Sequence, residues 1–162
     1  MQNAKDTFYI ALRNRLASLN PARAMLWRGV QRPGIMVEEA EAVVAQMAPD
    51  IFVLRWTGLK VDMNLPRTLA QLDCEIHYTT GGTQSNGGLD RGRALEAMDA
   101  ELVSLLNPPS AAKMDYTQTH ATALNSNVYW TLPLFGPETT IRERLDRLVK
   151  VSVFTYLDQE ER

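Results

Sequence analysis

The segment LAQLDCEIHY, residues 69 to 78, has the most regular pattern in the sequence. From Ala70 to Tyr78, apolar side chains occupy every second position and polar side chains stand between them. Because successive side chains of a β-strand point to opposite faces, this alternation predicts a strand with one face in the core. We expect three side chains to be buried and three to point outward: Leu72, Cys74 and Ile76 inward, and Gln71, Asp73 and Glu75 outward.

The segments around this strand predict the fold class. IFVLRWTGLKV, residues 51 to 61, is apolar on both parities, which is typical of a strand covered on both faces. The short gap before residue 69 favours an antiparallel hairpin. The spacing of apolar residues predicts helices over 6–19, 38–47 and 90–106, and extended segments over 25–33, 114–135 and 148–157. We therefore expect one domain over residues 1–162, with an α+β fold, a mostly antiparallel sheet and helices on one face.

Composition excludes several classes of protein. The 162 residues carry a net charge of −2, whereas nucleic-acid-binding domains are usually strongly basic. The single cysteine, Cys74, excludes an internal disulfide and a four-thiolate zinc site. No apolar run approaches the ~20 residues that cross a bilayer, so we expect a soluble protein without a membrane partner.

The sequence contains no common catalytic or cofactor motif. It lacks a GxxxxGK[ST] phosphate loop, GxGxxG, HExxH and GxSxG, so we expect no cofactor. Cys74 and His77 fall on opposite faces of their strand and cannot chelate one metal ion there. Asp73 and Glu75 share a face with His77, which fits either a solvated strand face or the acid-base pair of a carboxylate-dependent hydrolase.

Charge is unevenly distributed near the N-terminus. Residues 7–37 contain five arginines and no acidic residue, and an acidic stretch follows over 38–50. This pattern fits a solvated surface, a protein interface, where Arg and Trp are enriched, or a stacking surface for nucleic acid. The candidate interface residues are Arg13, Arg15, Trp27, Arg28, Arg32, Glu38, Glu39 and Glu41.

Two further segments are candidates for contacts with partners. An aromatic cluster around Trp130 and Phe135 fits either core packing or an interface, in which Trp and Tyr anchors carry much of the binding energy. Residues 79–88, TTGGTQSNGG, contain four glycines and no aliphatic side chain, so we expect a mobile loop. The candidate docking residues of this loop are Gly81, Gly82, Asn86, Gly87 and Gly88.

The order of these segments resembles the phage tail terminator, or tail-completion, family. The resemblance rests on the helix DTFYIALRNRLASL, the strand LAQLDCEIHY with its glycine-rich excursion, the helix LDRGRALEAMDAELVSLL, MDYTQT with a later VYW, and the strand LVKVSVFTYL. It implies a non-enzymatic ring, typically a hexamer, that caps the tail tube and binds the head–tail connector protein. Such a protein is found in the virion neck, and in the bacterial cytoplasm during assembly.

The resemblance also implies a lumen through which DNA passes without specific binding. Asp73 and Glu75 are the candidate lumen face, because a mildly acidic wall does not hold phosphates. The basic and acidic N-terminal segments could supply the complementary patches of a head-to-tail ring. An oligomeric connector or adaptor of another system, and a hydrolase using Asp73, Glu75 and His77, are the alternatives.

Overall fold

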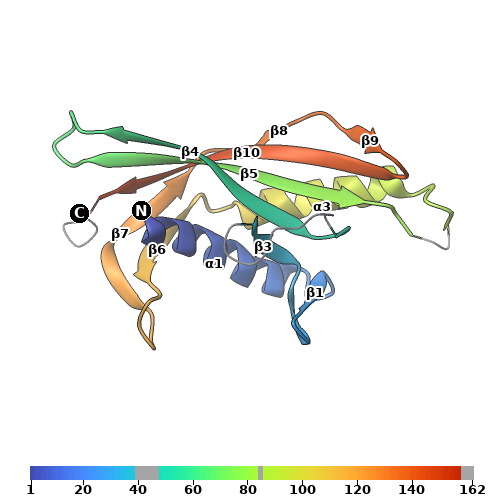
Figure 1. Cartoon of the computed structure of the whole chain (residues 1–162), viewed down its shortest axis with the longest axis horizontal. Helices are drawn as coiled ribbons and strands as arrows, with labels where there is room; N and C mark the ends of the chain where they lie inside the picture. Colours follow the sequence, from blue (N-terminus) through green and yellow to red (C-terminus); the bar gives the residue numbers. More distant parts are fainter. Residues whose placement is uncertain (39–47, 84–85, 158–162) are drawn as a thin grey trace.

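The computed structural model describes residues 1–38, 48–83 and 86–157, and it confirms the α+β fold (Figure 1). The main sheet has the order β3-β4-β5-β10-β7-β6, and β8 and β9 also pair with β10. Its strand pairs are antiparallel except β3 with β4, which makes the sheet mixed. The elements are α1 (Gln2–Leu19), β1 (Ala24–Trp27), β2 (Val30–Pro33), β3 (Ile35–Val37), β4 (Phe52–Asp62), β5 (Leu69–Thr80), α3 (Arg91–Leu105), β6 (Ser110–Asp115), β7 (Thr122–Trp130), β8 (Leu134–Phe135), β9 (Thr139–Ile141) and β10 (Arg144–Tyr156).

The strand predicted from alternation forms the middle of the sheet. Leu72, Cys74 and Ile76 of β5 are buried, and the polar residues between them lie on the opposite face, as predicted. β5 pairs with β10 along its whole length and with β4 in an antiparallel hairpin. It runs two residues further than expected, because the hydroxyls of Thr79 and Thr80 donate hydrogen bonds to the Leu145 carbonyl and the Asp50 carboxylate.

Both described helices cover the same face of the sheet (Figure 1). α1 and α3 each bury one stripe of apolar side chains against the apolar face of β5 and β10. Trp130 extends this core: its ring meets Phe8 edge to face at 5.1 Å, and its indole N–H donates to the Leu106 carbonyl. None of the described helices has the length and hydrophobicity to cross a bilayer.

The extended segment predicted over residues 25–33 is instead a two-stranded hairpin, β1–β2, outside the main sheet. Arg28 and Gly29 form its turn, with φ of 48° and 80°. Two consecutive positive φ angles are the signature of a type I′ turn, whose twist suits a hairpin. Arginine rarely adopts a positive φ, so the residues Arg28 and Gly29 do not predict a type I′ turn from sequence.

The C-terminal third contains more strands than the sequence predicted. The extended region over 114–135 is divided among β6, β7 and β8. The charged stretch over 137–147, for which no strand was predicted, contains β9 and the start of β10, which pair with each other while residues 137–144 remain exposed. The helix predicted over residues 38–47 lies outside the described residues, apart from Glu38.

Candidate functional site

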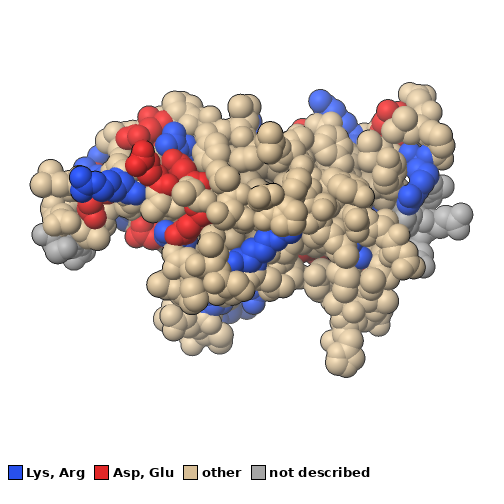
Figure 2. Space-filling view, turned by 180° about the vertical axis from the view of Figure 1, so that it is seen from behind, with Lys and Arg blue, Asp and Glu red and all other residues tan. Residues whose placement is uncertain are grey.

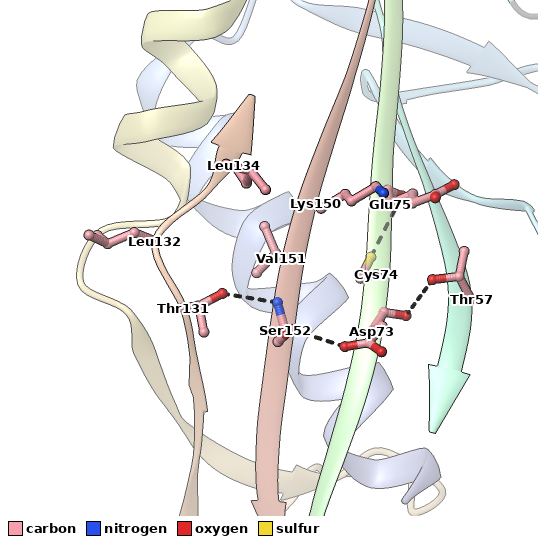
Figure 3. Close-up of a pocket in the computed structure, with 10 residues that line it drawn as sticks. All are labelled: Thr57, Asp73, Cys74, Glu75, Thr131, Leu132, Leu134, Lys150, Val151 and Ser152. Carbon is pink, nitrogen blue, oxygen red and sulfur yellow. Dashed lines mark hydrogen bonds between the residues drawn. The ribbon is translucent and has the colours of Figure 1, made fainter. Parts of the chain in front are cut away.

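The face of the sheet opposite the helices carries a groove of about 370 Å³ (Figure 3). Its floor consists of residues from β4, β5 and β10, and the segment that joins β7 to β8 forms one side. The groove contains both carboxylates that the sequence suggested as a lumen face. Its lining residues are Thr57, Asp73, Cys74, Glu75, Thr131, Leu132, Leu134, Lys150, Val151 and Ser152.

Strand register gives this face a mixed charge. Glu75 on β5 lies directly between Arg55 on β4 and Lys150 on β10. Figure 3 shows Lys150 and Glu75 side by side across the two strands. The two carboxylates of the candidate lumen face therefore lie among basic side chains of the neighbouring strands.

Asp73 is held by its neighbours. Its carboxylate accepts hydrogen bonds from the Gln71 amide and the Ser152 hydroxyl, each at 3.0 Å. The pKa of Asp73 lies below its usual value, first because Gln71 donates to the charged form, while partial burial opposes the shift and Ser152 and nearby Lys60 add to it. Asp73 therefore stays ionised at neutral pH, whereas a general acid needs a raised pKa.

His77 lies apart from Asp73 on the same face. Its ring nitrogen bonds to the Asp146 carboxylate of β10. Four residues along a strand separate His77 from Asp73, about 13 Å at ~3.3 Å per residue. These two groups, with Glu75 between them, do not converge on one substrate atom, so this arrangement favours a binding surface over a hydrolase site.

Exposed leucines border the groove. Leu134 lies across from Lys150 in the ladder, and Leu132 precedes it in the connecting segment. Their exposed fractions are 68% and 85%. The predicted aromatic cluster is thus divided, because Trp130 belongs to the core while Leu132 and Tyr129 are exposed.

Two of the candidate interface arginines bind within the chain. The guanidinium of Arg15 donates to the carbonyls of Leu105, Pro108 and Ser110 and lies over the Trp130 ring, and burial lowers its pKa. Arg32 donates to the Tyr9 hydroxyl and to the Ile35 carbonyl. These contacts bind the end of α3 to α1 and the β1–β2 hairpin to the main body.

The other candidate interface residues lie near the hairpin or the sheet edge. Arg28 is exposed at the turn and stacks on Trp27, which is half-buried. Arg13 is half-buried on α1, and Glu38 forms an ion pair with Arg55 at 3.8 Å. The remaining two, Glu39 and Glu41, lie outside the described residues.

The connection between β5 and α3 spans 81–90, two residues later than the predicted loop, and its described residues are hydrogen-bonded to one another. The Gly82 amide donates to the Thr80 hydroxyl, and Thr83 donates from its amide and its hydroxyl to the Asp90 carboxylate. The Gly88 amide donates to the Thr83 carbonyl. All five candidate docking residues lie in this connection, including Gly81 and Asn86. Three of them have the positive φ that glycine readily adopts: Gly82, Gly87 and Gly88.

Acidic and basic residues lie close together at one end of the face that Figure 2 shows. Figure 2 shows Asp and Glu gathered toward the end of the molecule at which α3 and β9 lie, with Lys and Arg among them. Two acidic side chains of α3 are already paired: Asp99 with Arg147, and Glu101 with Arg23. Part of the acidic charge of α3 is thus neutralised by arginines from other segments.

Comparison of the chain with protein-family models and with curated proteins finds no match. Function is therefore inferred from the arrangement of side chains and from the resemblance in sequence.

Several groove residues escaped the sequence analysis. The alternation of Val149, Val151 and Val153 places Lys150 and Ser152 on the polar face of β10, but it does not reveal which strand lies beside them. The sequence does not predict that Leu132 and Leu134 are exposed, because leucines are usually core residues.

Proposed function

We propose that this chain is a structural protein of a phage tail that assembles as a ring, caps the tail tube and joins it to the head-side connector. DNA passes through the lumen of the ring without specific binding. The observation that carries the proposal is the open face of the sheet, on which a mixed-charge groove adjoins exposed leucines. Such a surface suits contact with protein, since apolar anchors with a polar rim are typical of interfaces.

The distribution of exposed apolar residues supports a ring. A head-to-tail ring needs two different complementary surfaces on each copy. The chain exposes apolar side chains at separate places: Leu26 and Val30 on the β1–β2 hairpin, Leu59 and Met63 on the β4–β5 hairpin, and Leu132 beside the groove. Neighbouring copies, the tube and the connector each require a surface of this kind.

The polar groups of the open face favour assembly over catalysis. Asp73 and His77 each bind a partner on β10, and strand spacing keeps them apart. The hydrolase alternative needs these groups to act on one atom. We therefore place the function in contacts between proteins, with the glycine-rich loop as the candidate docking segment for the tube or connector.

Native mass and electron microscopy test the proposal. Native mass spectrometry and light scattering over a concentration series should give a closed oligomer, six copies being the expected number. Negative-stain images should show rings, and rings at the ends of tail tubes when both are mixed. A monomer at every soluble concentration, with bare tube ends, contradicts the proposal. Rings that never bind tubes favour the adaptor of another system.

A further inference from the structure

We propose that the end of the β4–β5 hairpin of one copy packs into the Leu132–Leu134 groove of the next copy. The hairpin patch comprises Leu59, Val61, Met63 and Leu65. The groove is the one bordered by Leu132 and Leu134 on the open face. This inference rests on the proposed ring and names the surfaces that join its subunits.

The hairpin patch begins on the helix-covered face of the sheet. Leu59 pairs with Leu72 and Val61 pairs with Ala70, so all four point toward the same face. Leu72 and Ala70 are buried, whereas Leu59 and Val61 are about half exposed. The elements that bury Leu72 and Ala70 of β5 therefore do not fully cover the neighbouring part of β4. Leu59 and Val61 remain partly exposed at the edge of the core.

The patch continues into the turn of the hairpin. Met63, 78% exposed, and Leu65, 42% exposed, follow β4 directly. Figure 1 shows this hairpin extending past the helices at one end of the long axis of the molecule. Exposed leucines scattered singly need no explanation, but four apolar side chains within seven residues on a projecting hairpin mark an interaction surface.

The edge of β4 at this patch is open to another chain. β4 pairs with β3 only through Phe52, Val53 and Leu54, so among the described residues no strand lies beside residues 55–62 on that side. An approaching protein can therefore reach Leu59 and Val61 from the edge without displacing any described strand.

The groove faces the other way. Leu134 shares the outer face with Lys150, and Glu75 lies on the same face beside Lys150. In Figure 3, Leu132 extends away from β10. Each surface is bordered by one basic and one acidic side chain: Lys60 and Asp62 at the hairpin patch, and Lys150 and Glu75 at the groove. The two surfaces therefore do not repel each other through a net charge of the same sign. Asp73 and Glu75 then belong to the polar rim of a subunit contact, in place of the lumen wall.

A second copy of the chain is the occupant that fits this arrangement. The two apolar surfaces differ and begin on opposite faces of one rigid sheet. A contact between them is therefore head-to-tail, so each copy still offers one free surface and assembly continues until the ring closes.

Two exposed substitutions and their mixture test the contact. Met63→Glu places a charge in the hairpin patch and Leu132→Glu places one beside the groove. Neither side chain is in the core, so both variants should keep the wild-type circular dichroism and melting temperature. We expect each variant alone to have monomer mass. We expect an equimolar mixture to form a 1:1 dimer that grows no further, because one intact hairpin meets one intact groove.

Leu89→Glu is the matched control, since Leu89 is 92% exposed and lies outside both surfaces. This variant should form the wild-type ring. Met63→Ser and Leu132→Ser replace the first pair if either charged variant unfolds.

The outcomes separate this contact from the ring itself. Rings formed by either variant alone, or a mixture that stays monomeric, overturn the contact while the proposed ring stands. A wild-type chain that is monomeric at every concentration overturns both.

Discussion

Arg15 illustrates how a residue that suggests a binding surface can instead stabilise the fold. Its guanidinium donates to three carbonyls just beyond and at the end of α3, where main-chain acceptors lack helical partners. The planar group also lies 5.3 Å from the centre of the Trp130 ring. One side chain on α1 therefore holds both the end of α3 and the start of β6.

We predict that Arg15→Ala lowers the free energy of unfolding by about 2–3 kcal/mol, because three charge-assisted hydrogen bonds are lost and the part-buried bonds to the Leu105 and Ser110 carbonyls are not replaced. Urea titration measures the change. Arg13→Ala on the same helix should change stability by no more than about 0.5 kcal/mol, as expected of a substitution that removes no such network. Equal losses in the two variants would mean that Arg15 acts only through its charge.

The surroundings of Tyr78 predict that the stability of the fold depends on pH in the alkaline range. Its ring is buried and its hydroxyl donates to Asp99, which in turn pairs with Arg147. Burial, followed by the bond to Asp99 and the charge of Asp99, raises the pKa of Tyr78 well above its usual value near 10. The folded state thus keeps the phenol proton where the unfolded state releases it.

Stability from this pKa difference is present below pH 10 and falls as the pH rises above it, by up to about 1.4 kcal/mol per pH unit. We expect Tyr78→Phe to be less stable than wild type at pH 8 and to lose stability less steeply between pH 10 and 11. Denaturant midpoints across this range measure both slopes. Tyr129→Phe, at a half-exposed position, should keep the wild-type slope.

At the scale of elements, one pair of glycines isolates the effect of backbone conformation. Gly29 has a φ of +80° in the β1–β2 turn and Gly92 lies in the first turn of α3, and in both cases an added Cβ meets nothing within 4 Å. We predict that Gly29→Ala lowers stability by about 1 kcal/mol, because L-residues are strained at positive φ.

Gly92→Ala should raise stability by about 0.5 kcal/mol, since alanine favours the helix. Thermal melts of the two variants give the comparison. Shifts of the same sign would contradict the assigned turn.

Period-two alternation predicted which side chains of β5 are buried, because it reports which of them enter the core, but it did not predict the last two residues of the strand. The β4–β5 hairpin followed from the short connection. The β1–β2 hairpin was missed because an Arg-Gly turn is uncommon, and β9 was missed because its three residues are exposed and supply no apolar pattern.

The sequence predicted which residues of β5 belong to the candidate site but not which residues of other strands surround them. Asp73 and Glu75 were assigned to the correct face, but their surroundings depend on β10, which is about 75 residues away along the chain. Residue pattern alone does not report which strands become neighbours. The pairing of Glu75 with Lys150 and Arg55, and of Asp73 with Ser152, therefore became visible only in the folded sheet.

At the scale of the whole molecule, we expect the proposed ring to depend on apolar contacts more than on charge. Several of the arginines that suggested electrostatic complementarity bind within the chain, among them Arg15, Arg23 and Arg32. Acidic and basic groups lie close together at one end of the face shown in Figure 2.

We therefore predict that raising NaCl from 0.1 M to 1 M leaves the ring intact, although the screening length falls from about 10 Å to about 3 Å. Analytical ultracentrifugation at both salt concentrations measures the fraction of assembled protein. Dissociation into monomers at 1 M NaCl would show that charged segments, and not the hairpin patch, join the copies.

The position of β10 has a consequence for how the chain is made. This strand, residues 144–156, lies between β5 and β7 and pairs with β8 and β9 as well. A ribosome must therefore translate residue 156 before the sheet can close, and until then the nascent polypeptide leaves β5 without its longest partner. Closure of the sheet during synthesis therefore waits until β10 has left the ribosome, and long-range pairing of this kind is slow. Meanwhile the emerging chain presents unpaired strand to its neighbours on a polysome, and chaperones have their main opportunity to act on it there.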